Sequence, residues 1–143
     1  MARDEQVRQF IGAIPFSRAL GMVVEQVGEG RARISMPWDA RLVGDPQTGV
    51  IHGGAVSALM DTCGGAAVMS HPALAAASAT IDLRIDYMRA ARPGQRITAE
   101  AECYHVTRTV AFVRATARDE EAGAPPVATA TGAFTFSAEG ERP

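Results

Sequence analysis

The chain has 143 residues and a formal net charge of −2, with 47% hydrophobic and 21% charged residues. These values are ordinary for a folded domain with its own core, and we expect one domain over residues 1–143. Because no run of basic residues is present, the composition argues against nucleic acid or an anionic membrane surface as a partner. The charged amino-terminal residues, the two cysteines and the lack of a long uninterrupted apolar stretch predict a cytoplasmic protein without disulfides or a membrane span.

The first expected elements are one helix and two strands. Residues 1–15 are expected to hold an amphipathic helix over 3–14, which Pro15 ends. Asp4 is expected to cap this helix. The apolar residues Val7, Phe10, Ile11 and Ile14 recur at the spacing of one helix face. Alternating apolar and polar residues then predict strands at 22–27 and 31–36, separated by a glycine-containing turn.

A long loop and a second helix form the centre of the chain. Residues 37–51 carry several turn residues and no clear period, and loops of this length in compact domains are often functional. The segment 55–69 that follows is apolar nearly all round, which is typical of a buried helix, and we expect that helix to span 54–69.

Four strands with clear alternation complete the chain. They are expected at 80–88, 97–106, 109–118 and 127–136. In the first of them, alternation places Ile81, Leu83, Ile85 and Tyr87 on one face and Thr80 on the other. The short links between the last strands favour antiparallel pairing, and their inward faces are rich in Ala and Gly, like the central helix. The sequence therefore predicts an α+β fold in which an antiparallel sheet of five or six strands wraps around that helix.

Asp61 is the residue most suggestive of chemistry, because it interrupts the most apolar segment of the chain. A carboxylate buried without a partner is costly, and such groups concentrate at functional sites. One interpretation is a general base or nucleophile in a dry site. The other is a local polar stripe that Asp61 shares with Ser57 and Thr62.

The residues His52, Gly53 and Gly54 stand where the buried helix is expected to begin. The first turn of a helix has free N–H groups and partial positive charge, and glycine lets a ligand approach the backbone. The N–H of Gly53 is therefore a candidate oxyanion hole for a carbonyl under attack. A simple turn from loop to helix is the alternative.

The spacing of Gly53 and Asp61 implies more than one copy of the chain. Eight residues of helix place them roughly 12 Å apart at about 1.5 Å per residue, too far for both to contact one reacting centre. Two antiparallel copies related by a two-fold axis would bring the start of one helix to the middle of the other. The sequence thus predicts a homo-oligomer, a dimer or tetramer, with shared sites.

The stretch from Gly49 to Asp61, which contains His-Gly-Gly, resembles the signature of the PaaI-type hotdog thioesterases, and residues 80–89 resemble the strand that follows it in that family. The likeness extends over the core, residues 16–137. It implies a hotdog fold, acyl-CoA as substrate, no metal or other cofactor, and sites shared between subunits.

The resemblance also implies residue roles. Gly53 N–H would polarise the thioester carbonyl, and Asp61 of the partner copy would activate water or attack directly. His52 would order the substrate end of the site, Thr80 would assist the carboxylate or its water, and Gly54 would border the substrate. The family often has an Asn six residues before the His, where this chain has Pro46, so the water-orienting role falls to another loop residue or is absent.

Four arginines are candidates for the CoA phosphates, since guanidinium groups bind phosphate in a bidentate manner. They are Arg84, Arg89, Arg92 and Arg108, of which we favour Arg89 and Arg92 beside a turn. The histidines and cysteines lack zinc-ligand spacing, and no dinucleotide, P-loop or nucleophile-elbow motif is present.

Two other functions remain open on the same fold. One is a non-catalytic module that binds or senses acyl-CoA, which would not require Asp61. The other is a hydratase or dehydratase acting on acyl thioesters, which would pair a His with a carboxylate at other positions.

Overall fold

The structure is a computed structural model that describes residues 2–139; Met1 and residues 140–143 of the expected domain lie outside the described residues. Its order of elements is helix, strands, helix, strands, as the sequence predicts. The helices are α1 (Arg3–Ala13), α2 (Pro15–Ala19), the 3-10 turn η1 (Ala40–Leu42) and α3 (Gly53–Met69). The strands are β1 (Val23–Gly28), β2 (Arg31–Met36), β3 (Val43–Asp45), β4 (Val50–Ile51), β5 (Thr80–Tyr87), β6 (Ile97–Val106), β7 (Val110–Arg118) and β8 (Ala128–Thr135).

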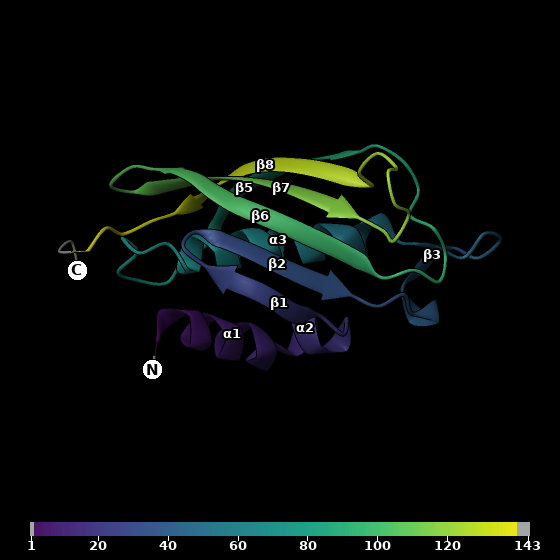
Figure 1. The fold of residues 1–143 in the computed structure, drawn as a ribbon, viewed down its shortest axis with the longest axis horizontal. Helices are drawn as coiled ribbons and strands as arrows, with labels where there is room; N and C mark the ends of the chain where they lie inside the picture. The colour runs from purple at the N-terminus through teal and green to yellow at the C-terminus, as the bar shows by residue number, and fades with distance from the viewer. Residues whose placement is uncertain (1, 140–143) are drawn as a thin grey trace.

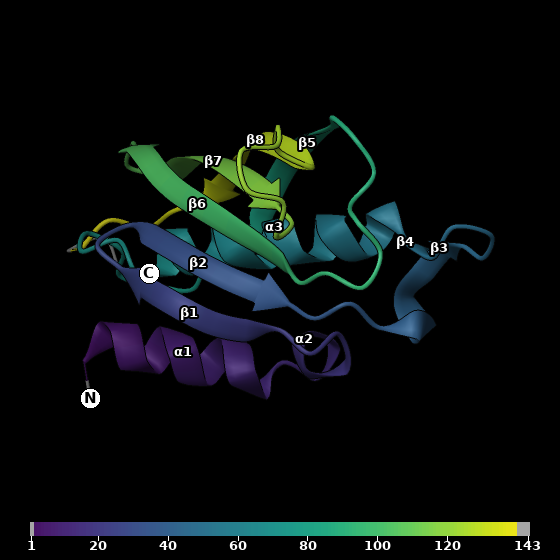
Figure 2. The same ribbon diagram turned by 45° about the vertical axis from the view of Figure 1, so that its right-hand side comes forward.

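Six strands form one antiparallel sheet in the order β1-β2-β6-β7-β8-β5 (Figure 1). Strands β1 and β5 are its edges, and α1 lies alongside β1 (Figure 2). The sheet curves around α3, which runs along its inner face in both views. The predicted α+β hotdog architecture is therefore confirmed.

Small side chains allow α3 to lie close to the sheet. Ala99, Ala117 and Ala128 occupy one row across β6, β7 and β8, and all three are fully buried beneath the helix. Gly64 completes this contact from the helix side, because a Cβ there would lie 3.0 Å from the ring of Phe134. Within residues 2–139, no helix is both long enough and apolar enough to cross a membrane.

The amino-terminal helix ends as predicted, but its surroundings differ from expectation. Its N-cap is Ala2, which makes no side-chain capping bond, so the prediction of Asp4 as cap is wrong. Pro15 does not lead into a loop. It occupies the first turn of α2, where its fixed φ fits and its missing N–H is not needed.

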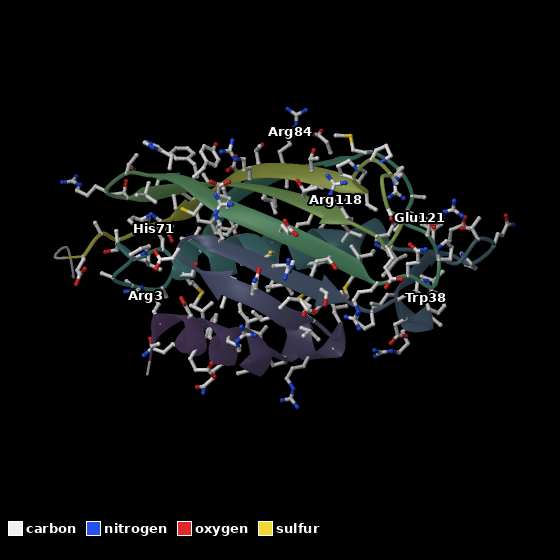
Figure 3. The ribbon with its side chains drawn as sticks, in the orientation of Figure 1. Arg3, Trp38, His71, Arg84, Arg118 and Glu121 are labelled. Atoms are coloured by element: carbon white, nitrogen blue, oxygen red, sulfur yellow. The ribbon has the colours of Figure 1, made fainter. Side chains whose placement is uncertain are left out.

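The expected loop 37–51 contains a 3-10 turn and a short hairpin, which its many turn residues did not predict. After η1, β3 and β4 pair as a short antiparallel hairpin with Pro46 following β3 at its tip. This hairpin projects beyond the six-stranded sheet at the end where α3 begins (Figures 1 and 2). Trp38, which precedes η1, lies at the same end of the molecule (Figure 3).

The expected alternation fails at the start of β5. The pairing of β5 with β8 slips between Thr80 and Asp82, which is a β-bulge. The bulge turns Thr80 toward α3 and leaves Ile81 56% exposed, although alternation predicted the opposite faces for both residues. This correction matters for the site, because Thr80 becomes a neighbour of Asp61.

Candidate active site

The start of α3 is held by His52, the N-cap residue. Its Nδ1 accepts a hydrogen bond of 2.7 Å from the N–H of Gly54, and its carbonyl accepts one of 3.0 Å from the N–H of Ala55. A neutral imidazole that accepts at Nδ1 carries its proton on Nε2. The Nε2–H of this exposed side chain is therefore a donor directed away from the helix turn.

The carbonyl of Gly53 has two side-chain donors. The hydroxyl of Ser57, one turn later, donates at 3.2 Å, and the phenol of Tyr87 at the end of β5 donates at 2.8 Å. The two hydroxyl oxygens also lie in contact with each other; because each hydroxyl carries one proton, the two donations to the carbonyl use both protons. By contrast, the N–H of Gly53 has no acceptor within residues 2–139. This is the free first-turn N–H that an oxyanion hole requires.

Asp61 lies half-buried in the middle of α3 and is joined to the edge strand. Thr80 Oγ1 donates to Asp61 Oδ1 over 2.7 Å. The second carboxylate oxygen, Oδ2, has no partner in the described part of the chain. One oxygen is thus fixed by a hydroxyl, and the other is available to accept a proton or to attack.

One stripe of α3 is not fully covered by its own sheet. Its half-buried residues recur at helical spacing and are mostly small or polar: Ser57, Ala58, Asp61, Thr62 and Gly65. Asp61 lies at the middle of this stripe, while Gly53 lies about 12 Å away at the start of the helix. Because both residues lie on α3, a single copy holds the N–H of Gly53 and the carboxylate of Asp61 apart along the helix.

A cavity of about 290 Å³ opens beside the start of α3. Gly53 and Tyr87 border it, and most of its other walls are apolar. Those walls are Val50, Ile51, Val56, Met88, Ala90, Ala91 and Val127, together with part of Arg89. Gly53, whose N–H has no acceptor in the described part of the chain, thus borders an apolar space that a substrate can fill.

Arg89 and Arg92, the two arginines predicted to bind CoA phosphates, differ in their partners and in their exposure. Arg89 forms a bidentate ion pair with Asp119, at 2.7 Å for both contacts, and its Nε donates to the carbonyl of Pro125 at 2.9 Å. This pair holds the pKa of Asp119 well below its ordinary value. Arg92 is mostly exposed and faces Glu121 at 3.5 Å. The guanidinium of Arg92 is therefore the more accessible of the two.

The tip of the β3–β4 hairpin offers one free polar side chain near Pro46. Asp45 accepts hydrogen bonds from the N–H of Gln47 (3.0 Å) and the hydroxyl of Thr48 (2.8 Å), which lower its pKa. Asp45 and Thr48 thus stabilise the turn itself. The side-chain amide of Gln47 is exposed and unpaired within residues 2–139.

The cysteines are structural. Cys63 is fully buried, and its thiol lies 3.4 Å from the carbonyl oxygens of both Ala32 and Ala99, which share its one proton. Burial raises its pKa to about 12. Burial also raises the pKa of Cys103, to about 11. Across residues 2–139, no three His, Cys, Asp or Glu side chains lie close enough together to hold a metal ion.

Sequence reasoning missed the roles of three residues. Tyr87 was assigned only to a strand face, Ser57 only to a polar stripe, and Asp119 to no role. The spacing of Gly53 and Ser57, four residues apart on a helix, was a signal for one of these contacts. Nothing in the spacing of Tyr87 or Asp119 indicated their partners, which lie 34 and 30 residues away in the chain.

Comparison with known proteins places this geometry in a family. The thioesterase superfamily model matches residues 48–125, from the hairpin tip to the β7–β8 turn. The medium/long-chain acyl-CoA thioesterase YigI of Escherichia coli K12 is 30% identical over 125 residues, which cover 78% of this chain and 80% of that protein.

Solved structures of other proteins also match this chain over most of its length. A protein from Pseudomonas aeruginosa is 36% identical with a TM-score of 0.81, covering 94% of this chain and 98% of that one. A variant of the phenylacetic acid degradation protein PaaI from Thermus thermophilus is 29% identical with a TM-score of 0.71, covering 85% and 98%. These matches confirm the resemblance seen in the sequence.

Proposed function

Because this chain belongs to the thioesterase superfamily and is a PaaI-type acyl-CoA thioester hydrolase, we propose that Asp61 and the N–H of Gly53 perform the hydrolysis together across a dimer interface. The products are a free carboxylic acid and CoA. The observation that carries the proposal is the pairing of a free first-turn N–H at Gly53 with a half-buried carboxylate at Asp61 on one helix.

The N–H of Gly53 serves as the oxyanion hole. It lies at the positive end of a 17-residue helix, borders the cavity and has no acceptor in the described chain. Negative charge that develops on the thioester oxygen is stabilised there by the N–H and by the helix dipole. His52 presents its Nε2–H next to this point and orders the substrate end of the site.

The carboxylate comes from the second copy. The uncovered stripe of α3 has small residues around Asp61, which suits close packing against the same stripe of another helix. A two-fold axis through that stripe makes the helices antiparallel and brings Asp61 of each copy to Gly53 of the other. The dimer then holds two equal sites.

The reaction can proceed by either of two balanced routes. In one, Asp61 takes a proton from water, the hydroxide forms a bond to the thioester carbon, and CoA leaves as a thiolate that recovers the proton. In the other, Asp61 attacks the carbon, CoA leaves as a thiolate, and water hydrolyses the resulting anhydride and supplies the proton that the thiolate takes up. Thr80 holds the carboxylate oriented in both routes.

The apolar walls of the 290 Å³ cavity suit an aryl-acyl group or a short-to-medium acyl chain. The relative YigI is named for medium- and long-chain acyl-CoA, which extends the range worth testing. Arg92, which is mostly exposed and follows the cavity residue Ala91, is the cation for a CoA phosphate, and Gly54 borders the entering thioester.

A thiol-release assay on a panel of acyl-CoA esters tests the proposal. The panel runs from acetyl- to palmitoyl-CoA and includes phenylacetyl- and benzoyl-CoA, with wild type and Asp61→Asn side by side. Loss of at least about a hundredfold in kcat for Asp61→Asn supports the assignment. Asp86→Asn is the control and retains activity; this exposed β5 carboxylate pairs only with Arg84 among residues 2–139. Wild-type activity that survives Asp61→Asn contradicts it.

A further inference from the structure

We propose that Tyr87 and Ser57 are positioning residues that fix the Gly53–Gly54 peptide and thereby aim the catalytic N–H of Gly53 into the cavity. This inference rests on the proposed role of Gly53. It adds a function for two hydroxyls that the reaction itself does not use, and we call this arrangement, together with the His52 contact, the peptide clamp.

The Gly53–Gly54 peptide is held at both ends. Its carbonyl oxygen accepts from the Tyr87 phenol at 2.8 Å and from the Ser57 hydroxyl at 3.2 Å. Its N–H donates to His52 Nδ1 at 2.7 Å. Both polar groups of this peptide are therefore bonded to side chains, so its plane has little freedom to rotate.

The preceding peptide, between His52 and Gly53, is restricted in its rotation as a result. The carbonyl of His52 accepts from Ala55 N–H at 3.0 Å, while the N–H of Gly53 in the same peptide has no acceptor among the described residues. Glycine permits wide rotation about its own φ and ψ, so an N–H placed beside two such residues is poorly oriented by the backbone alone. Fixing the next peptide limits that rotation before substrate arrives. A donor that needs no reorganisation stabilises a developing oxyanion better than a mobile one.

Tyr87 also packs its ring against the same turn. A Cβ on Gly53 would lie 3.5 Å from the ring, and the ring borders the cavity. The phenol belongs to β5, the edge strand that also carries Thr80. One strand thus positions both catalytic elements: the carboxylate through Thr80 and the amide turn through Tyr87.

Replacement of the hydroxyl alone tests the clamp. Tyr87→Phe keeps the ring, and the chain offers a matched control in its only other tyrosine, Tyr104, a half-exposed residue of β6 stacked under Arg114. With hexanoyl-CoA, we expect Tyr87→Phe to lower kcat about tenfold with KM within about twofold, because only oxyanion stabilisation is weakened. Tyr104→Phe should match wild type.

Ligand affinity separates positioning from general destabilisation. A trifluoromethyl-ketone analogue of hexanoyl-CoA, whose tetrahedral hydrate places an oxygen at the oxyanion position, should bind Tyr87→Phe about tenfold more weakly than wild type. The thioether analogue, which has no carbonyl, should bind both proteins equally. Ser57→Ala should show a smaller loss of the same kind and Ser57→Thr should restore it, which keeps the test decisive if Tyr87→Phe folds poorly.

Two results would overturn the clamp. One is unchanged kcat and ketone affinity in both Tyr87→Phe and Ser57→Ala; the other is a rise in KM alone, which would make Tyr87 only a cavity wall. The affinity comparison requires no turnover and can be repeated in Asp61→Asn protein. Failure of the clamp is therefore distinguishable from failure of the proposed function, in which Asp61→Asn keeps wild-type activity.

Discussion

Thr80 on the edge strand β5 donates its hydroxyl to Asp61 on the central helix, with 2.7 Å between Oγ1 and Oδ1. The contact exists because the β-bulge between Thr80 and Asp82 turns Thr80 inward. A hydrogen bond to an ionised carboxylate is among the stronger kinds in proteins, and it restricts the rotation of the side chain. The bulge in β5 is thus a feature of the candidate active site as well as of the sheet.

Removing this hydroxyl should slow the reaction. Thr80→Val preserves the shape of the side chain and deletes the donor, so Asp61 loses its orientation; we expect kcat to fall about tenfold or more, consistent with about 1.5–3 kcal/mol for such a bond. Thr80→Ser should retain most of the activity. Steady-state kinetics with hexanoyl-CoA measure both, and equal rates for Thr80→Val and wild type would contradict the role.

The bulge also explains where sequence reasoning succeeded and where it failed. Periodicity located the central helix and the strands of the main sheet, because both patterns arise from burial on one face. It failed at Thr80 and Ile81, since alternation assumes an unbroken ladder and a slip of one residue exchanges the faces. The family resemblance pointed to Thr80 despite the alternation, and the structure supplies the reason.

Gly132 on β8 is required opposite this bulge. A Cβ there would lie 2.4 Å from the carbonyl oxygen of Asp82, so Gly132→Ala must displace the edge strand. We expect a loss of about 1–3 kcal/mol in the free energy of unfolding, measured by urea denaturation, together with reduced activity as Thr80 moves. Gly12→Ala, on the exposed side of α1 with no atom within 4 Å of the new Cβ, should be neutral or slightly stabilising.

The pair of Arg89 and Asp119 should contribute mainly to stability. Asp119 has no exposed side-chain surface and Arg89 is 24% exposed, so removing the carboxylate leaves a poorly solvated cation. For Asp119→Ala we expect a loss of about 3 kcal/mol in the free energy of unfolding, from chemical denaturation at neutral pH. Exposed Asp86→Ala should cost much less.

The same pair predicts a dependence of stability on pH. The pKa of Asp119 is lowered in the folded protein below its ordinary value of 3.8, chiefly by the hydrogen bonds from Arg89. Its contribution is therefore complete above the unfolded value and is lost as pH falls through the lowered folded value. The stability difference between wild type and Asp119→Asn should shrink steadily below about pH 4. A difference that stays constant down to about pH 2 would contradict this assignment.

The candidate site was only partly predictable from the sequence. His52, Gly53 and Asp61 lie within ten residues of one another, so local spacing around one helix was enough to propose them as candidates. The donors to Gly53 and Asp61 from β5 depend on how distant strands pack, which spacing does not encode. Arg89 illustrates the same limit, since its buried partner Asp119 lies in the turn after β7.

The sharpest test of shared sites mixes two inactive variants. Gly53→Pro deletes the N–H proposed as the oxyanion hole. It does so at the first position of α3, where proline is favoured, and His52 already has the extended conformation (ψ of 135°) that a following proline needs. Asp61→Asn removes the carboxylate. In a mixed dimer, one site combines the intact Gly53 of one copy with the intact Asp61 of the other, and the second site lacks both. Random assembly at equal amounts should restore about a quarter of wild-type activity, since half of the dimers are mixed and each has one working site.

Co-expression with two affinity tags isolates the mixed dimer, whose activity should be about half that of wild type. If each copy carries its own complete site, every mixture stays inactive, and the proposal of a site shared between two copies fails.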